Sequence, residues 1–257
     1  VPMDNGAEYE GNPLYLLAEM TWPELKEALD TVDLAVIPLG ATEQHGPHGT
    51  FAVDTGRAEG FAHRLGERLY PRAVVCPTVP YGISPHHMSF PGTITLTGST
   101  FIKVLDEIVE SLYRHGLRKF FFANSHGGNR PGLEILMGQL TAKYNDVKAA
   151  HCGISRMAGE VYAKETHSEI MGHACEGEMS QAMVLAPYTV RTEALARADL
   201  NYTLEDWERR KVFSVAQTWD KITASGDLGD ATKASPELGE KIVTTALDNL
   251  VECLRNF

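Results

Sequence analysis

The segment 36–48 carries side chains that could bind a metal ion. It begins within an apolar run, 34–39, that is typical of a parallel strand covered on both faces, and then turns polar. Glu43 and His45 are two residues apart, so both side chains would leave the same face of an extended segment. Asp54 follows nine residues after His45. This set predicts a divalent-metal site at the end of a strand. The alternative is a polar loop with ordinary capping residues.

Further candidate side chains follow other expected elements. His126 comes directly after an aromatic strand, and Glu178 lies near the start of an apolar helix-like run. The full set of candidates is Glu43, His45, Asp54, His126, His173, Glu176 and Glu178. Carboxylates and imidazoles without thiolates suit zinc, manganese or iron. If five of these seven residues bind metal, they exceed what one tetrahedral ion with an open position would use. Two ions that share a carboxylate therefore fit the set better.

Such a pair of ions implies hydrolytic chemistry. Metal-bound hydroxide would be available near neutral pH and would attack a carbonyl carbon, while the metal takes up the developing negative charge. An unligated histidine or glutamate would then deliver a proton to the leaving group. Motifs of other hydrolases and nucleotide-binding enzymes, GxSxG, the P-loop, GxGxxG and HExxH, do not occur in the sequence.

The elements that must position these residues alternate between strand and helix. Apolar patterns predict strands at 34–39, 73–79, 119–124 and 147–154, and helices at 21–29, 57–69, 99–115, 133–144 and 235–254. This order predicts one domain over residues 1–257, with a mostly parallel sheet between two helical layers. In such a sheet the site collects at the carboxyl ends of the strands. We expect 188–229 to be an irregular segment that covers the site, with Trp207 and Trp219 packing a core or a subunit contact.

Composition excludes several classes of function. The net charge is −11 and no Lys/Arg cluster occurs, which argues against nucleic acid or an anionic membrane as a partner. Four widely spaced cysteines without a CxxC pair favour a reducing cytoplasm over a disulfide framework. No apolar run approaches 18 residues, so we expect no membrane span, and residues 1–13 do not resemble a signal peptide.

Four sequence blocks resemble, in order, the signature blocks of the creatininase family of metal-dependent amidohydrolases. They are Glu43–His48 with Asp54, Phe90–Thr93, Asn124–Asn129 and His173–Ser180. The resemblance implies a three-layer α/β/α fold, a dinuclear metal centre with two divalent ions per chain, and a homohexamer. Zinc is the first expectation for the metal, and manganese or iron is the alternative.

The resemblance also assigns roles to residues. It implies that Asp54 bridges the two ions, and that the complete set of metal ligands is Glu43, His45, Asp54, His126 and Glu178. Glu178 could instead cap a helix, which would move the ligand to Glu176. We predict that His173 or Glu176 assists proton transfer, and that His87 and Tyr81 contact substrate.

Departures from the family pattern bear on the substrate. Creatininase has a glutamate ligand two residues after the histidine that matches His126, whereas Gly128 stands here, which argues against creatinine as the substrate. The commonly acidic position before His87 is His86, and the stretch 49–53 also differs. We therefore predict C–N cleavage of a small, cyclic, polar amide. One alternative is ring-opening C–C cleavage of a keto-inositol, and another is a non-catalytic protein that binds a metal or ligand.

Overall fold

Five parallel strands form the centre of the molecule. The structure, a computed structural model, describes residues 13–201, 203, 205–206 and 215–257. The strand order is β1-β3-β2-β4-β5. The strands are β1 (Tyr15–Leu16), β2 (Leu34–Leu39), β3 (Ala73–Val75), β4 (Lys119–Asn124) and β5 (Lys148–Cys152). β2 and β4 pair in register from Leu34 opposite Lys119 to Leu39 opposite Asn124. The two central strands therefore end at the same edge of the sheet.

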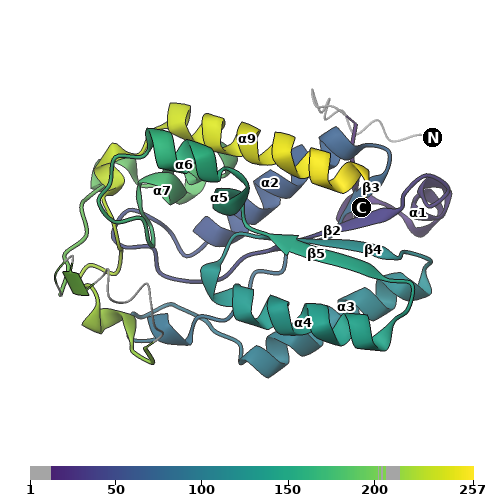
Figure 1. Ribbon diagram of the computed structural model, residues 1–257, viewed down its shortest axis with the longest axis horizontal. Helices are drawn as coiled ribbons and strands as arrows, with labels where there is room; N and C mark the ends of the chain where they lie inside the picture. Colours follow the sequence, from purple (N-terminus) through teal and green to yellow (C-terminus); the bar gives the residue numbers. More distant parts are fainter. Residues whose placement is uncertain (1–12, 202, 204, 207–214) are drawn as a thin grey trace, which may run out of the picture.

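Helices cover both faces of this sheet (Figure 1). One face carries α2 (Val53–Leu69), α5 (Ile154–Met157), α6 (Gly159–Glu165), α7 (Glu176–Leu185) and α9 (Pro236–Arg255). The other face carries α1 (Trp22–Ala28), α3 (Gly98–Arg114) and α4 (Arg130–Lys143). The three-layer α/β/α architecture with a parallel sheet is thus confirmed.

Alternation of side chains along β4 explains how one strand serves two cores. Phe121 packs into the core beneath α2 and α9, whereas Phe120 and Phe122 pack into the core beneath α3 and α4. Successive side chains of a strand point to opposite faces, so a continuous apolar run suits a strand that is covered on both sides. α3 begins at a capped turn, where the Thr97 side chain accepts a hydrogen bond from the Thr100 amide.

Most predicted elements occur within a few residues of their expected bounds. The strand predicted at 73–79 ends as β3 at Val75, although the Cys76 and Val79 amides still donate to the Val36 and Pro38 carbonyl oxygens of β2. β1, α5 and α6 were not predicted. Trp207 lies outside the described residues. Among the described helices, none combines the length and apolar character that a bilayer crossing requires.

Candidate metal centre

The carboxyl edge of β2 and β4 brings the first four candidate ligands together. Glu43 and His45 follow β2, His126 follows β4, and Asp54 lies in the first turn of α2. All four are buried, with exposed fractions of 4% or less. The sheet edge thus gathers residues that are far apart in sequence, as parallel sheets do at their functional edges.

Asp54 lies between two histidines. Its Oδ1 is 3.4 Å from Nε2 of His45, and its Oδ2 is 3.0 Å from Nδ1 of His126. Arg57 Nη1 is 3.2 Å from the same Oδ1. Burial favours the neutral carboxyl, but the two histidines outweigh it and hold the pKa of Asp54 well below its usual range. The carboxylate is therefore ionised and presents one oxygen to each imidazole.

Backbone carbonyls orient the two imidazoles. His45 Nδ1–H donates to the carbonyl oxygen of Glu43 at 3.0 Å, which leaves Nε2 facing Asp54. His126 Nε2–H donates to the carbonyl oxygen of Ile83 at 3.1 Å, which leaves Nδ1 facing Asp54. A histidine that donates one ring N–H to the protein keeps the other nitrogen free as a metal ligand.

The protonation of this cluster is far from ordinary. Burial raises the pKa of Glu43 to about 7. Burial lowers the pKa of His45 and of His126, but the carboxylates outweigh it and raise both to about 9. In the described part of the chain, neither Oε2 of Glu43 nor Nε2 of His45 has a hydrogen-bond partner. Buried polar atoms are normally paired, so these atoms fit the coordination of a cation.

His173 and Glu178 extend the cluster from the side of α7. His173 Nε2–H donates to the carbonyl oxygen of Gln44 at 2.6 Å. Its Nδ1 faces Oε1 of Glu43 at 3.6 Å and Oε2 of Glu178 at 4.0 Å. Glu178 accepts hydrogen bonds from the Ala174 amide at 2.7 Å and from Arg57 at 3.0 Å. Ala174 has a φ of 50°, a left-handed conformation that costs free energy and holds the turn into α7.

Among the residues that the structure describes, three overlapping triads have ligand atoms within 4.8 Å of one another. They are Glu43–His45–Asp54, His45–His173–Glu178 and Glu43–His87–His173. Glu43, His45 and His173 each belong to two of the triads. The triads therefore form one continuous cluster of candidate ligands.

The Gln44 side chain, which the sequence patterns did not single out, fixes His87. Its Oε1 accepts from the Gly46 amide at 2.9 Å, and its Nε2 donates to the Gly226 carbonyl at 2.7 Å. The same Nε2 donates to Nδ1 of His87 at 2.7 Å, so the Nε2–H of His87 faces Oε1 of Glu43 at 3.4 Å. Burial and the neighbouring His173 hold the pKa of His87 far below its usual range. His87 is therefore neutral.

A cavity of about 230 Å³ adjoins the cluster. Most of the candidate ligands line it, together with His86, His87, His173 and Trp219. The Trp219 ring lies 4.4 Å from the His87 ring between centroids. Trp219 packs on a small apolar cluster, as expected, and it also forms a wall of this cavity. No spacing in the sequence could reveal this, because Trp219 comes from an irregular segment.

Two other predicted site residues lie away from this cavity wall. The Glu176 carboxylate accepts from the amides of His167 and Ser168 at 3.0 and 2.8 Å, and from the Ser168 hydroxyl at 2.6 Å. Tyr81 is 44% exposed. Neither residue is among those that line the cavity. The predicted roles of Glu176 in proton transfer and of Tyr81 in substrate binding stay predictions.

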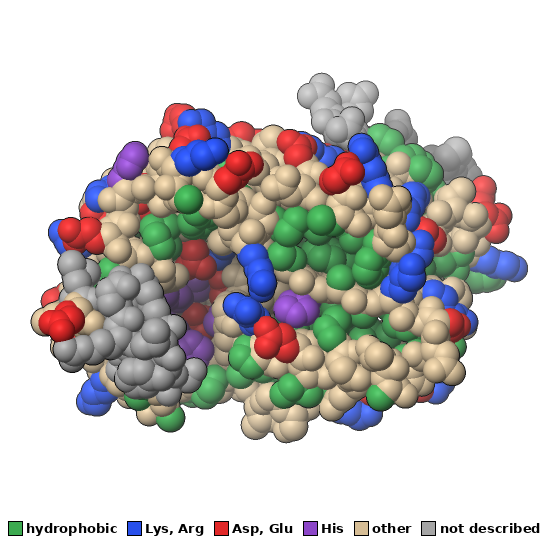
Figure 2. All heavy atoms as spheres, in the orientation of Figure 1, with side chains coloured by type: hydrophobic (Ala, Val, Ile, Leu, Met, Phe, Trp, Pro, Cys, Tyr) green, Lys and Arg blue, Asp and Glu red, His purple; other side chains and the backbone are tan. Residues whose placement is uncertain are grey.

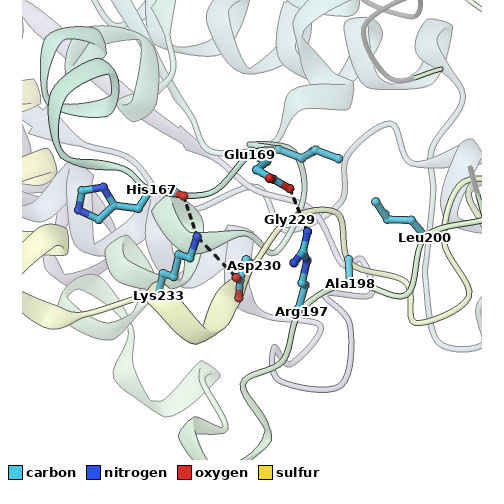
Figure 3. A pocket seen from close by; sticks show the side chains of 9 residues that line it. His167, Glu169, Arg197, Ala198, Leu200, Gly229, Asp230 and Lys233 are labelled. Atoms are coloured by element: carbon cyan, nitrogen blue, oxygen red, sulfur yellow. Dashed lines mark hydrogen bonds and ion pairs between the residues drawn. The ribbon is translucent and has the colours of Figure 1, made fainter. Parts of the chain in front are cut away.

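Charged contacts anchor the segment that leads to His173 (Figure 3). Lys233 Nζ donates to the His167 carbonyl oxygen at 2.7 Å and lies 3.8 Å from Asp230. Arg197 and Glu169 form an ion pair at 3.0 Å. Together with the Glu176 contacts, these bonds fix the position from which His173 reaches the cluster.

Gly128 stands where no side chain fits. A Cβ at this position would lie 2.1 Å from the carbonyl oxygen of Ile83 and 2.4 Å from Nε2 of His126. A ligand side chain here would therefore require the backbone to shift. Glu178, from α7, lines the same cavity as Gly128 and supplies an acidic side chain there.

Curated relatives of the chain are hydrolases. It is 32% identical over 227 residues to the mycofactocin precursor peptide peptidase of Mycobacterium tuberculosis, covering 84% of this chain and 82% of that protein. It is 26% identical to the creatinine amidohydrolase of Pseudomonas putida, covering 93% and 95%. A 3-dehydro-scyllo-inosose hydrolase of Thermotoga maritima is 33% identical over 109 residues, covering 42% of this chain and 34% of that protein.

Solved structures agree with these relatives. A manganese form of creatininase superposes with a TM-score of 0.75 at 25% identity, covering 95% of this chain and 98% of that chain. A mutant creatininase of zinc–zinc type has a TM-score of 0.73 at 25% identity, covering 94% and 97%. The family described as "Creatininase: Creatinine amidohydrolase" matches residues 18–254. The chain therefore belongs to the creatininase family of hydrolases.

Proposed function

We propose that this protein is a dinuclear metal-dependent hydrolase that cleaves the C–N bond of a small, polar, cyclic amide. The observation that carries the proposal is the position of Asp54, whose two oxygens face two different imidazoles at 3.4 and 3.0 Å. A carboxylate that is shared in this way suits two ions and not one.

Two ion positions share Asp54 in this proposal. Glu43 and His126 complete the first, and the ring nitrogen that His126 offers is Nδ1, which faces Asp54. His45 and Glu178 complete the second, in line with their common triad. Zinc is the first candidate, because the donors are imidazoles and carboxylates, and manganese or iron is the alternative. The zinc–zinc and manganese forms of creatininase support this choice.

His173 is the proposed group for proton transfer. Burial, followed by the nearby charge on His45, holds the pKa of His173 well below its usual range, so the ring is neutral. Its Nδ1 carries the lone pair, because Nε2–H is bonded to Gln44. A neutral imidazole at the cavity can take a proton from water and pass it to the departing nitrogen. Bound divalent ions would activate water and polarise the carbonyl group.

The cavity wall supports binding of a flat polar molecule. Trp219 and His87 line the wall with rings that contact each other, and burial, with a smaller contribution from His126, lowers the pKa of the adjacent His86 to about 4. The wall therefore adds uncharged aromatic surface beside the acidic cluster. Such a surface suits stacking of a planar amide.

The test is a screen of metal-reconstituted protein on cyclic amides, short peptides and keto-inositols. We expect a new amine to form, and we expect His173→Ala to lower kcat while both ions stay bound. Ring opening of a keto-inositol without a new amine would favour the C–C alternative, which the inosose hydrolase relative supports. Bound metal without turnover on any of these substrates would favour the non-catalytic alternative.

The homohexamer and the cytoplasmic location stay predictions. All four cysteines are free, which is in keeping with a reducing compartment. Light scattering of the purified protein would test the hexamer, with six chains per particle expected and one or two chains contradicting it.

A further inference from the structure

A second cavity, of about 320 Å³, lies next to the metal centre. The two cavities share His126, Gly127 and Glu178 in their walls. The remaining walls of the second cavity come from the carboxyl ends of β4 and β5, from Arg57 of α2, and from residues of α4 and α5. A molecule at the metal centre could therefore extend a substituent past His126 into this space.

Three arginines, Arg57, Arg130 and Arg156, line the second cavity, together with one carboxylate, that of Glu178. Arg57, in its floor, is neutralised by Asp54 and Glu178 at 3.2 and 3.0 Å. Arg130, the first residue of α4, uses its Nε to bond Glu134 at 2.9 Å. Arg156, in α5, forms no ion pair with any residue that the structure describes. Within the described residues, the Arg156 guanidinium thus has no ion-pair partner. Arg130 bonds Glu134 through Nε, which leaves its two Nη groups for a ligand.

The two arginines approach the same residue. Both guanidinium charges act on His151, in β5, whose pKa is lowered by burial first and by these charges, against an opposing effect of Glu134. His151 is therefore neutral and adds a polar ring to the lining of the cavity. Figure 2 shows Lys/Arg, His and Asp/Glu side chains gathered near the centre of this face, beside a hollow that contains His and Asp/Glu side chains.

We propose that this second cavity binds a carboxylate group of the substrate, with Arg156 as the main contact and Arg130 as its support. The planar guanidinium donates two parallel hydrogen bonds to a carboxylate, a geometry that a lysine cannot offer. The inference rests on the proposed function, because it places the scissile amide at the metal centre and the carboxylate beyond His126. It narrows the substrate class to polar amides that carry a free carboxylate, and acylated amino acids and short peptides serve as open-chain probes of that carboxylate.

The first experiment compares matched substrates with the zinc-loaded protein. Dipeptides with a free carboxyl terminus and the same dipeptides as carboxamides have nearly the same shape, but only the free acids carry a negative charge at that terminus. We expect kcat/KM to be at least about tenfold higher for the free acids, through KM. Arg156→Gln should abolish that preference by raising KM for the free acids. Equal kcat/KM for the two series would overturn the proposal.

A matched control separates the cavity from general charge effects. Arg114 lies at the end of α3, pairs with Glu110 one turn earlier and is exposed, much as Arg130 pairs with Glu134 on α4. Arg114→Gln removes the same charge away from both cavities, and we expect it to leave the preference for free acids intact. A loss of preference in this variant would show that net charge alone is responsible.

A binding experiment keeps the inference testable if no peptide is cleaved. N-acetylglycine and N-acetylglycinamide are titrated into the zinc-loaded protein and followed by NMR. We expect the acid to bind about ten- to a hundredfold more tightly, and Arg156→Gln to remove the difference. Equal binding, or a difference that survives Arg156→Gln, would refute the carboxylate site whether or not amides are hydrolysed. Inorganic phosphate is titrated in the same way. If it binds more tightly than N-acetylglycine and Arg156→Gln removes its binding, the cavity is reassigned to free phosphate.

Discussion

Replacing Asp54 with asparagine tests the bridge because it keeps the shape of the side chain and removes its charge. The two carboxylate oxygens lie 3.4 and 3.0 Å from the ring nitrogens of His45 and His126. Loss of one charge-assisted contact costs about 1.5–3 kcal/mol, which corresponds to about ten- to a hundredfold in affinity. Because each oxygen serves a different ion in our proposal, Asp54→Asn should weaken both ions by at least that factor.

The structure indicates that the variant will fold. Arg57 keeps its bonds to Glu178 at 3.0 Å and to Gln181 at 2.8 Å, so the substitution leaves no buried guanidinium without an acceptor. The assay is calorimetric titration of zinc into the metal-free protein, with elemental analysis after gel filtration. A variant that binds two ions with wild-type affinity would refute the bridge, and loss of a single ion would assign Asp54 to one site.

Asp33→Asn is the matched control for this variant. Asp33 is also an aspartate that pairs with cations, Arg72 at 3.0 Å and Lys119 at 2.7 Å. It lies directly before β2, at the opposite edge of the sheet from the metal centre. We expect Asp33→Asn to leave the binding of both ions unchanged, which separates the loss of a ligand from the loss of an ion pair.

Three further predictions concern the same site. Glu178→Gln should lose mainly one ion, as measured by elemental analysis. Glu176→Gln should keep both ions, because the Glu176 carboxylate is hydrogen-bonded to a neighbouring loop. The reverse result would move the ligand from Glu178 to Glu176. Gly46→Ala should lower the free energy of unfolding by about 1–2 kcal/mol, because Gly46 has a φ of 61°, and an unchanged Tm would contradict this. Zinc should bind more weakly at pH 6 than at pH 8 and should release protons. Burial raises the pKa of Glu43 to about 7. Burial lowers the pKa of His45, but the neighbouring carboxylates outweigh it and raise that pKa to about 9. The protons on Glu43 and His45 must leave when zinc binds. Titration heats that do not depend on the ionisation enthalpy of the buffer would rule out that release.

Patterns that come from local geometry were predictable from the sequence. The bounds of β2 and β4 agree with the predicted 34–39 and 119–124, because strands buried on both faces need continuous apolar runs. The placement of Glu43, His45 and His126 followed from the rule that parallel strands end at one functional edge.

Contacts between distant segments were not predictable in the same way. Glu176 and Glu178 lie two apart at the start of α7, and a step of two turns a helix by about 200°, so only one can face the cavity. The sequence could not decide which one does, because the choice depends on how α7 packs against α2. Gln44 is a comparable case, because its amide joins His87 to Gly226 and neither partner is near it in sequence.

Metal content per chain tests the central claim most directly. The protein would be purified without an affinity tag and without added metal, and elemental analysis would be repeated after reconstitution with zinc, manganese and iron in turn. Our account predicts two equivalents per chain, and one equivalent in Glu178→Gln. A single equivalent in the wild-type protein would contradict the dinuclear centre, and no bound metal after any reconstitution would contradict the proposed chemistry altogether.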